Sequence, residues 1–481
     1  MMVLEELYPR RVFYYFEKIA AIPHGSGNTK AVSDYLVSFA KEHGLYWEQD
    51  DKNNVIVKKK AAAGYENAKT IMIQGHMDMV CEKERDCEID FSREGLSLFV
   101  EDGYVQARGT TLGGDDGIAL AYALALLEAD IPHPELEVIF TVDEETGMLG
   151  AKDIDLSRLK GRRLLNIDSE EEGHFLTSCA GGLSLIGRIP VKRISQSGQK
   201  LRITVTGLAG GHSGAEIHKE HGNADILMGR VLYAVMEESP MGIIRLAGGG
   251  KDNAIPRECI AEILVPQEMA EQVKMVADGL DLVFQKELRV SDGGVRVLFE
   301  DQGNATADIL DYGSVHKVLY YLRTVPDGVL HRSQEMPELV ETSLNLGIME
   351  LQSDCLYTVT SIRSSVSSRK EDVRERVEAV IALLGGETEL EGDYPAWEYR
   401  SNSPLREQIS AVYTDLYGEE PVFDAIHAGL ECGLFAEKIP ELDCVSFGPN
   451  ILDIHTPKER LDIASTGRVW DFLVAFLKQA G

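Results

Sequence analysis

The sequence predicts an α/β protein built on a mostly parallel sheet with helices on both faces, interrupted by an inserted α+β domain of two ferredoxin-like lobes. Three observations predict it. Apolar runs of strand length alternate with helical segments over the first 190 residues, a βαββαβ order follows between 187 and 392, and the first pattern resumes after 393. The expected domains are therefore residues 1–186 with 393–481, and residues 187–392 as the insertion.

The first domain is expected to hold four strands and one fully buried helix. Residues 116–130, DGIALAYALALLEAD, are apolar nearly all round, as a helix covered on every side requires. The strand-like runs are NNVIVKK (53–59), TIMIQGH (70–76), ELEVIFTVD (135–143) and RRLLNIDS (162–169). Continuous apolar runs are typical of parallel strands, and sites in such sheets form beyond the carboxyl ends of the strands.

The insertion shows the order of a ferredoxin-like unit. Its expected elements are strand 199–207, helix 223–238, strands 241–248 and 258–266, helix 267–288 and strand 294–301. One such unit needs about a hundred residues, and the insertion is about twice as long. A second lobe is therefore expected from 309 to 392, including helix 370–386 and strand 387–394.

The last segment returns to the pattern of the first domain. It contains helix 403–418, strands 421–429 and 442–449, and a closing helix at 465–480. These two separated parts are expected to form one domain, because the simplest arrangement is a single α/β domain with an inserted lid.

Composition excludes several classes of function. A formal charge of −31 repels nucleic acid and anionic membranes, so neither is an expected partner. No apolar run reaches the roughly 18 residues that a membrane helix needs. Seven cysteines without a CxxC pair indicate neither a disulfide framework nor a thiolate zinc site. The N-terminal segment lacks a signal-peptide pattern, so we expect a cytoplasmic protein.

Imidazole and carboxylate side chains gather where the predicted strands end and where the buried helix begins. They are His76, Asp78, Asp115, Asp116, Glu144, Glu145, Asp168 and, near the C-terminus, His455. Two imidazoles with three or four carboxylates suit a pair of divalent ions such as zinc, cobalt or manganese. One carboxylate must bridge them, because two neighbouring cations repel each other and need shared negative charge.

The adjacent acids Glu144 and Glu145 can divide the work at such a site. One can bind a metal, while the other takes a proton from activated water. Asp78 is within reach of the second ring nitrogen of His76 and would fix its tautomer. Each motif alone also has an ordinary explanation: a strand ending at the surface, an acidic helix cap or a solvated loop. Their joint placement at one sheet edge favours a dinuclear metal site.

Nine motifs along the chain carry a resemblance to a known family. In order they are IPHGSGNT, GHMDMV, TLGGDDGIAL, VDEETGMLGA, NIDSEEEG, GGHSGAEIHKEHGNA, KDNAIPRE, HAGLECG and GPNILDIHTPKERL. The chain resembles the dinuclear metallopeptidases that include carboxypeptidase G, peptidase T and aminoacylases. Within them it most resembles the aminoacyl-histidine dipeptidases, the carnosinase-like (Xaa-His) branch. The resemblance spans nearly the whole chain.

The resemblance implies a ligand for each of two metal ions. Asp115 is similar to the residue that bridges both ions. His76 and Asp168 would complete the protein ligands of one ion, and Glu145 and His455 those of the other. The implied cofactors are two divalent ions, with zinc as the first expectation and cobalt or manganese as alternatives.

The remaining residues of this edge receive roles in the same way. Glu144 resembles the general base, and Asp78 resembles the residue that orients His76. Asp116 departs from the family, which more often has asparagine there. The family's cis peptide bond would join Asp115 to Asp116.

The inserted lid supplies candidates for substrate binding. His212 resembles the lid histidine that polarises the scissile carbonyl. The further contacts that the resemblance implies are Asn253, Arg257, Arg363 for the substrate carboxylate, His427 and Glu431. His427 is explained equally well as a structural residue, while His218 and His221 are better explained as solvated or capping side chains.

The implied function is metal-dependent hydrolysis of short peptides, above all dipeptides of the Xaa-His (β-Ala-His) type. A water activated between two divalent ions would attack the peptide carbonyl, with Glu144 as general base. Two alternatives stay open: an N-acyl amino acid deacylase on the same scaffold, and a non-catalytic peptide-binding homologue. The resemblance also favours a homodimer.

Overall fold

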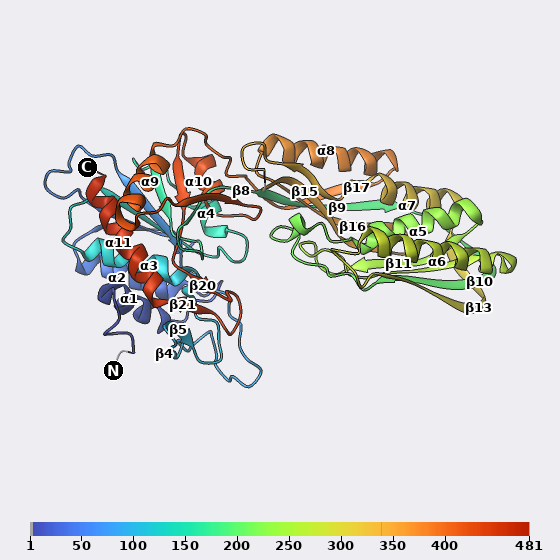
Figure 1. The fold of residues 1–481 in the computed structure, drawn as a ribbon, viewed down its shortest axis with the longest axis horizontal. Coiled ribbons are helices and arrows are strands. Elements are labelled where there is room, and N and C mark those ends of the chain that lie inside the picture. The colour runs from blue at the N-terminus through green and yellow to red at the C-terminus, as the bar shows by residue number, and fades with distance from the viewer. Residues whose placement is uncertain (1–2, 338, 481) are drawn as a thin grey trace. The chain divides into compact units, whose positions relative to one another are not determined.

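A computed structural model describes residues 3–337 and 339–480, and the chain divides into two compact units (Figure 1). The first unit is Met1–Cys179, Tyr399–Ala425 and Leu430–Gly481. The second is Ala180–Glu398 with Ile426–Gly429. The insertion therefore runs from 180 to 398 rather than from 187 to 392. The predicted first boundary of the insertion was too late in the sequence, because strand β9 (Gly181–Pro190) belongs to the sheet of the second unit.

The sheet of the first unit has eight strands in the order β1-β2-β6-β3-β7-β19-β8-β18. They are β1 (Tyr46–Gln49), β2 (Val55–Lys59), β3 (Ile71–His76), β6 (Leu136–Thr141), β7 (Arg163–Asn166), β8 (His174–Cys179), β18 (Val422–Ile426) and β19 (Asp443–Ser446). The inner strands β6, β3, β7 and β19 are parallel, whereas the pairs β1–β2, β2–β6 and β19–β8 are antiparallel. The predicted fold class is confirmed, with the parallel strands at the centre of the sheet.

The carboxyl ends of the central strands meet at one edge of this sheet. His76, the last residue of β3, pairs with Thr141, the last residue of β6. Gln74 on β3 pairs with Asn166, the last residue of β7. Loops that leave these three strands therefore start side by side, which is where ligand sites form in parallel sheets.

The described part of the first unit has seven helices, and one of them is almost wholly buried. They are α1 (Arg10–Ala20), α2 (Lys30–Glu42), α3 (Gly114–Glu128), α4 (Leu149–Asp153), α9 (Pro404–Tyr417), α10 (Cys432–Lys438) and α11 (Ile463–Gln479). Of these, α2, α3, α9 and α10 contact this sheet directly. Every residue of α3 from Asp116 to Leu127 is buried, as its apolar sequence predicts. The hydroxyl of Tyr122, the only polar side chain between Gly117 and Leu127, donates a 2.8 Å hydrogen bond to the carbonyl of Thr466 in α11.

A small sheet brings the C-terminal segment beside the start of α3. It has the strand order β20-β21-β5-β4. Its members are β4 (Leu98–Glu101), β5 (Tyr104–Ala107), β20 (Ile451–Leu452) and β21 (Arg460–Asp462). The loop between β20 and β21 carries His455. This hairpin is antiparallel, with Ile451 opposite Leu461.

The second unit is built on one nine-stranded sheet. Its strands are β9, β10 (Arg193–Thr206), β11 (Gly242–Gly249), β12 (Cys259–Val265), β13 (Arg296–Leu310), β14 (Gly328–Arg332), β15 (Val340–Leu351), β16 (Cys355–Ser364) and β17 (Glu387–Tyr394). Its helices are η1 (Ile217–Lys219), α5 (Ala224–Glu238), η2 (Gln267–Met269), α6 (Ala270–Glu287), α7 (Tyr312–Thr324) and α8 (Ser367–Leu383). Within the described ranges, no helix of either unit has the length and apolar character that crossing a bilayer needs.

The second unit consists of two βαββαβ lobes, and one lobe interrupts the other. The strand order is β13-β10-β12-β11-β15-β16-β9-β17. Strands β10, β11, β12 and β13 with α5 and α6 form one lobe, and β9, β15, β16 and β17 with α7 and α8 form the other. When the strands of each lobe are numbered by their order in the sequence, they lie side by side in the order fourth, first, third, second. The sequence placed the second lobe wholly after residue 309, but its first strand, β9, precedes the other lobe. Figure 1 shows α5 to α8 along one face of this sheet.

We expect the aromatic cluster under α11 to be a main source of stability in the first unit. The ring of Phe472 contacts those of Phe175, Tyr413, Phe447 and Phe476 at centroid distances of 5.5 to 6.1 Å. Phe472→Ala should lower the free energy of unfolding of this unit by about 3–5 kcal/mol, because it removes buried ring surface and leaves a cavity.

Urea denaturation followed by circular dichroism measures this loss. The control is Leu282→Ala in the second unit, where the side chain is 69% exposed. The control should change stability by less than about 0.5 kcal/mol. Equal effects of the two substitutions would contradict the assignment of Phe472 to the core.

Candidate metal centre

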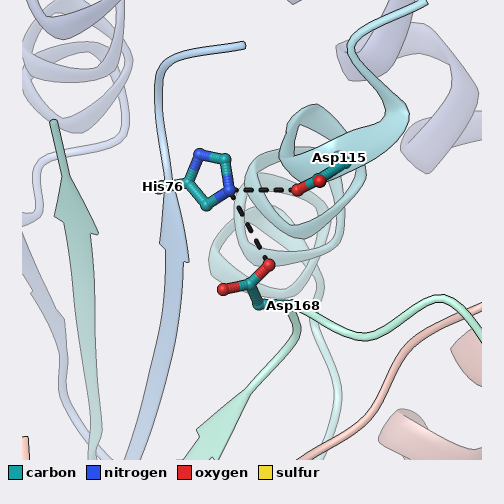
Figure 2. Close-up of side chains that lie close together, drawn as sticks. All are labelled: His76, Asp115 and Asp168. Atoms are coloured by element: carbon teal, nitrogen blue, oxygen red, sulfur yellow. Dashed lines mark hydrogen bonds and ion pairs between the residues drawn. The ribbon is translucent and has the colours of Figure 1, made fainter. Parts of the chain in front are cut away.

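Two of the predicted ligands, both carboxylates, converge on an imidazole nitrogen of a third (Figure 2). Nε2 of His76 lies 3.0 Å from Oδ1 of Asp115 and 3.7 Å from Oδ1 of Asp168. His76 ends β3, Asp115 lies in the first turn of α3, and Asp168 follows β7 in sequence. Two of these side chains, His76 and Asp168, therefore lie at the ends of parallel strands, and Asp115 lies at the start of the buried helix.

The second carboxylate oxygen of Asp115 takes part in a second cluster. Nε2 of His455 lies 3.2 Å from Oδ2 of Asp115 and 3.0 Å from Oε1 of Glu145. In each of the two groups, one possible ligand atom per residue lies within 4.8 Å of the others. Asp115 therefore belongs to both groups, with one oxygen facing each imidazole, which is the arrangement that a bridging ligand requires.

The hydrogen-bonding pattern of His76 fits a metal ligand. Its Nδ1 lies 3.0 Å from the backbone carbonyl oxygen of Asp78, and a carbonyl can only accept, so Nδ1 carries the proton. The lone pair of Nε2 then points at Asp115 and Asp168. Oδ2 of Asp168 is buried and has no hydrogen-bond partner among the described residues. Two divalent cations would satisfy these lone pairs and offset the charge of three carboxylates.

Electrostatics around the two imidazoles show the same excess of negative charge. Burial lowers the pKa of His76, but Asp115, Asp168 and Asp78 outweigh it and hold that pKa well above its usual value. Asp115 and Glu145 raise the pKa of His455 to about 10. The negative charge around each imidazole therefore favours binding of a cation, either a proton or a metal ion.

The peptide bond between Asp115 and Asp116 is cis, as the resemblance implies. Asp116 is buried and belongs to neither of the two ligand groups. Its Oδ2 accepts a 3.1 Å hydrogen bond from the backbone N–H of His76. Burial and the charge of Asp168 raise its pKa well above the usual value. Asp116 therefore supports the backbone of His76, a predicted ligand.

Asp78 has a second task that the sequence did not indicate. Its carboxylate lies 3.5 Å from Nδ1 of His76, whereas its backbone carbonyl oxygen lies 3.0 Å from the same nitrogen. The same carboxylate accepts hydrogen bonds from the backbone N–H groups of Glu144 (3.0 Å) and Glu145 (3.3 Å), and from the hydroxyl of Ser26 (2.8 Å). Asp78 thus fixes the loop that carries both glutamates as well as the segment that carries His76.

Glu144 lies beside the two groups. One of its oxygens is within 4.8 Å of ligand atoms of His76 and Glu145. Burial raises the pKa of Glu144 well above its usual value, and the charges of Asp168, Glu431 and Glu145 add to this effect while His76 opposes it. A buried carboxyl with a raised pKa beside a candidate metal site is a candidate general base.

Glu431, expected to contact substrate, lies fully buried behind β3. Its Oε2 accepts hydrogen bonds from Nε2 of Gln74 at 2.5 Å and from the hydroxyl of Thr141 at 2.7 Å. The side-chain amide of Asn166 donates in turn to Oε1 of Gln74 at 2.5 Å. Burial raises the pKa of Glu431 to about 8. This network connects the ends of β3, β6 and β7, so it favours a supporting role for Glu431.

Glu459 is the residue of this region that sequence reasoning missed. Its buried carboxylate accepts hydrogen bonds from four successive backbone N–H groups, those of residues 112 to 115. Burial and the charge of Asp115 raise its pKa to about 7, against the opposing effect of the N–H donors. Its position four residues after His455 is the one sequence signal that could have marked it.

The remaining predicted residues lie in the second unit. Nδ1 of His212 accepts hydrogen bonds from the backbone N–H groups of Gly214 (3.2 Å) and Ala215 (3.0 Å). Burial lowers the pKa of His212, and the charge of Arg363 lowers it further. Asn253 is exposed, and its carbonyl accepts a 2.8 Å hydrogen bond from the N–H of Ser213 beside His212.

Arg363 and His427 also belong to the surroundings of His212. Nη1 of Arg363 donates to the hydroxyl of Tyr394 at 2.9 Å. Nε2 of His427 lies 2.7 Å from Oγ of Ser343, and burial, with the charge of Arg363, lowers its pKa to about 3. Arg257 is exposed, and its Nε donates to the carbonyl of Leu208 at 3.4 Å.

Comparison with known proteins gives the same picture over the whole chain. The family model described as peptidase family M20/M25/M40 matches residues 72–180 and 202–479. The cytosol non-specific dipeptidase of Escherichia coli K12 is 36% identical over 100% of this chain and 99% of its own length. The crystal structure of aminoacylhistidine dipeptidase from Vibrio alginolyticus superposes with a TM-score of 0.93 at 35% identity, covering 99% of this chain and 98% of that one.

A more distant structure shares the fold. The structure of an aminopeptidase from Bacillus cereus has a TM-score of 0.57 at 16% identity, over 98% of this chain and 99% of its own. The resemblance predicted from the motifs is thereby confirmed. Both the sequence and the fold show that this chain belongs to peptidase family M20/M25/M40.

Proposed function

We propose that this protein is a dinuclear metallopeptidase that hydrolyses dipeptides, with dipeptides of the Xaa-His type as its preferred substrates. One observation supports the chemistry above all others: the two oxygens of Asp115 face two different imidazoles, with Glu144 beside them. The substrate class is supported by the names of the two full-length relatives, a non-specific dipeptidase and an aminoacylhistidine dipeptidase.

Two divalent ions fit the residues that are present. We propose that His76, Asp115 and Asp168 hold one ion, and that Asp115, Glu145 and His455 hold the other. Imidazole and carboxylate ligands suit zinc, cobalt and manganese, and zinc is the first choice for ligands of this kind. When bound, such ions polarise a carbonyl group and lower the pKa of water, which supplies a nucleophile at neutral pH.

Glu144 is proposed to move the proton. In its ionised form it removes a proton from the attacking water, and it then hands this proton to the amine that leaves. Its raised pKa and its position beside the ligand groups support this role. The hydrogen bond from its N–H to Asp78 holds its backbone in place.

The second unit is proposed to bind the substrate. Nδ1 of His212 accepts two backbone N–H bonds, so the ring proton resides on Nε2, which can donate to the carbonyl oxygen as charge develops there. Arg363 is proposed to bind the substrate carboxylate through its two-pronged guanidinium. Asn253, Arg257 and His427 remain proposed substrate contacts.

The cytoplasm is the proposed compartment. The name of the Escherichia coli relative refers to the cytosol, and all seven cysteines of this chain are free thiols, as is usual in a reducing compartment. A homodimer stays a prediction.

Removal of metal should abolish peptidase activity, and restored ions should return it. After dialysis against a chelator, we expect hydrolysis of Xaa-His dipeptides to resume on addition of zinc, cobalt or manganese. His455→Ala should lower the metal content, measured by inductively coupled plasma mass spectrometry, from two ions per chain towards one. The exposed His331→Ala is the control and should keep both ions. Full activity in the metal-free protein would refute the dinuclear mechanism.

Substitution of the general base should separate metal binding from catalysis. Glu144→Gln keeps the size of the side chain but removes its ability to take a proton, so kcat should fall by about 10²–10⁴-fold while two ions per chain remain bound. The control is Glu171→Gln, whose side chain is 72% exposed. Steady-state kinetics of both variants give the answer, and near-normal turnover of Glu144→Gln would remove Glu144 from this role.

A substrate screen should distinguish the proposed activity from its alternatives. The substrates are β-Ala-His and other Xaa-His dipeptides, dipeptides of the Leu-Gly type, and N-acetyl amino acids. We expect kcat/KM to be highest for Xaa-His dipeptides, by at least ~10-fold over N-acetyl amino acids, because a buried polar contact that a substrate leaves unpaired weakens its binding. Preference for N-acetyl amino acids would make the protein a deacylase. No turnover with any of the three metals would make it a non-catalytic peptide-binding protein.

A further inference from the structure

We propose that Glu459 is the positioning residue of the metal centre: it fixes the backbone of Asp115 and ties it to the segment that carries His455, without binding a metal itself. This inference rests on the proposed dinuclear site. It assigns a role to a carboxylate that the mechanism above does not use.

The side-chain hydrogen bonds of Glu459 go to the chain just before and at the start of α3. Its Oε2 accepts hydrogen bonds from the N–H groups of Leu112 (2.7 Å) and Gly113 (3.1 Å). Its Oε1 accepts hydrogen bonds from the N–H groups of Gly114 (2.7 Å) and Asp115 (3.3 Å). The side chain is 97% buried, since only 3% of the residue is exposed. Charge-assisted hydrogen bonds of this kind are about twice as strong as neutral ones.

These contacts replace a local helix cap. The first N–H groups of a helix have no partner within it, and a side chain at the N-cap position commonly satisfies one of them. The N-cap of α3 is Gly113, which has no side chain to do so. A carboxylate from more than 340 residues away in sequence takes this place. Its negative charge is also favourable at the positive end of the helix dipole.

The same residue belongs to the turn that presents His455. The N–H of Glu459 donates to the carbonyl of Thr456 at 3.1 Å, and the hydroxyl of Thr456 donates to the carbonyl of Asp453 at 2.7 Å. Strand β21 starts at the next residue, Arg460, and pairs with β5. Glu459 thus links Asp115 and His455, which share one of the proposed metal ions. Its side chain holds the backbone of Asp115, and its own backbone belongs to the turn that follows His455.

The close approach depends on a glycine at position 114. A Cβ atom there would lie 3.1 Å from Oε1 of Glu459, closer than most such contacts in proteins. Gly114→Ala should therefore push the carboxylate away by a few tenths of an ångström. This gives a second and milder way to disturb the same hydrogen bonds.

Glu459→Gln should weaken metal binding. The amide of glutamine has only one oxygen, so two of the four backbone N–H groups would face an NH₂ group that cannot accept. Residues that support a metal ligand from behind typically change metal affinity by about 10–100-fold, and we expect a loss of that size. Because Asp115 would shift relative to both imidazoles, the geometry around the ions should change as well.

Titration of the metal-free protein with Co²⁺ tests this. The measurements are the visible absorption of bound cobalt, which reports ligand geometry, and the number of ions bound. The matched control is Glu137→Gln. Glu137 is a fully buried carboxylate of the same unit whose oxygens accept hydrogen bonds from the N–H groups of Lys160 and Gly161. We expect weaker cobalt binding and an altered spectrum for Glu459→Gln, and wild-type behaviour for the control.

Wild-type cobalt affinity and spectrum in a folded Glu459→Gln variant would overturn the inference. If circular dichroism shows that this variant does not fold, Gly114→Ala decides: we expect a smaller change in the same direction, and unchanged cobalt binding would overturn the inference. If the unaltered protein binds no Co²⁺, the proposed function itself fails, which is a distinguishable result.

Discussion

The carboxylate of Asp115 lies between two imidazoles, and buried carboxylates of the first unit hold the backbone around it in place. One oxygen is 3.0 Å from Nε2 of His76, and the other is 3.2 Å from Nε2 of His455. With Glu145 and Asp168, three carboxylates share a small and largely dehydrated volume. Neutral imidazoles cannot compensate this charge, whereas divalent cations can. Because the proposed ligands come from distant parts of the chain, the proposed ions would stabilise the folded state as a whole.

The acids of this site divide into two kinds. Some offer oxygens to the two clusters, and others clamp the backbone of those that do. Asp116 holds the N–H of His76, Asp78 holds the N–H groups of the adjacent glutamates, and Glu459 holds the start of α3. A buried carboxylate is well suited to this work, since it can accept several N–H bonds at once. The acids of this edge thus hold the backbone in place as well as offering oxygens to the proposed ions.

Local patterns in the sequence were sufficient for much of the fold and of the site. The buried helix was predictable because nearly all of residues 116–130 are apolar. The gathering of acids and histidines at one sheet edge was predictable because several of them follow strand-like runs, whereas their division into ligands of two ions came from the family resemblance and stays a proposal. The nesting of the two lobes was not, since β9 carries no local mark of pairing with the distant β16. The role of Glu459 was not predictable for a similar reason. Its partners are backbone groups far away in sequence, and a single glutamate in a polar loop looks like an exposed one.

The nesting of the lobes also bears on how the polypeptide emerges during synthesis. All strands of the inner lobe have been made once residue 310 leaves the ribosome, so this lobe can complete its sheet early. Strand β9 is made before any of them, yet its neighbours β16 and β17 end only at residues 364 and 394. Its backbone groups must therefore wait without native partners for the longest stretch of translation in this unit. Such non-local pairing slows folding and leaves strand edges open to wrong partners in the meantime.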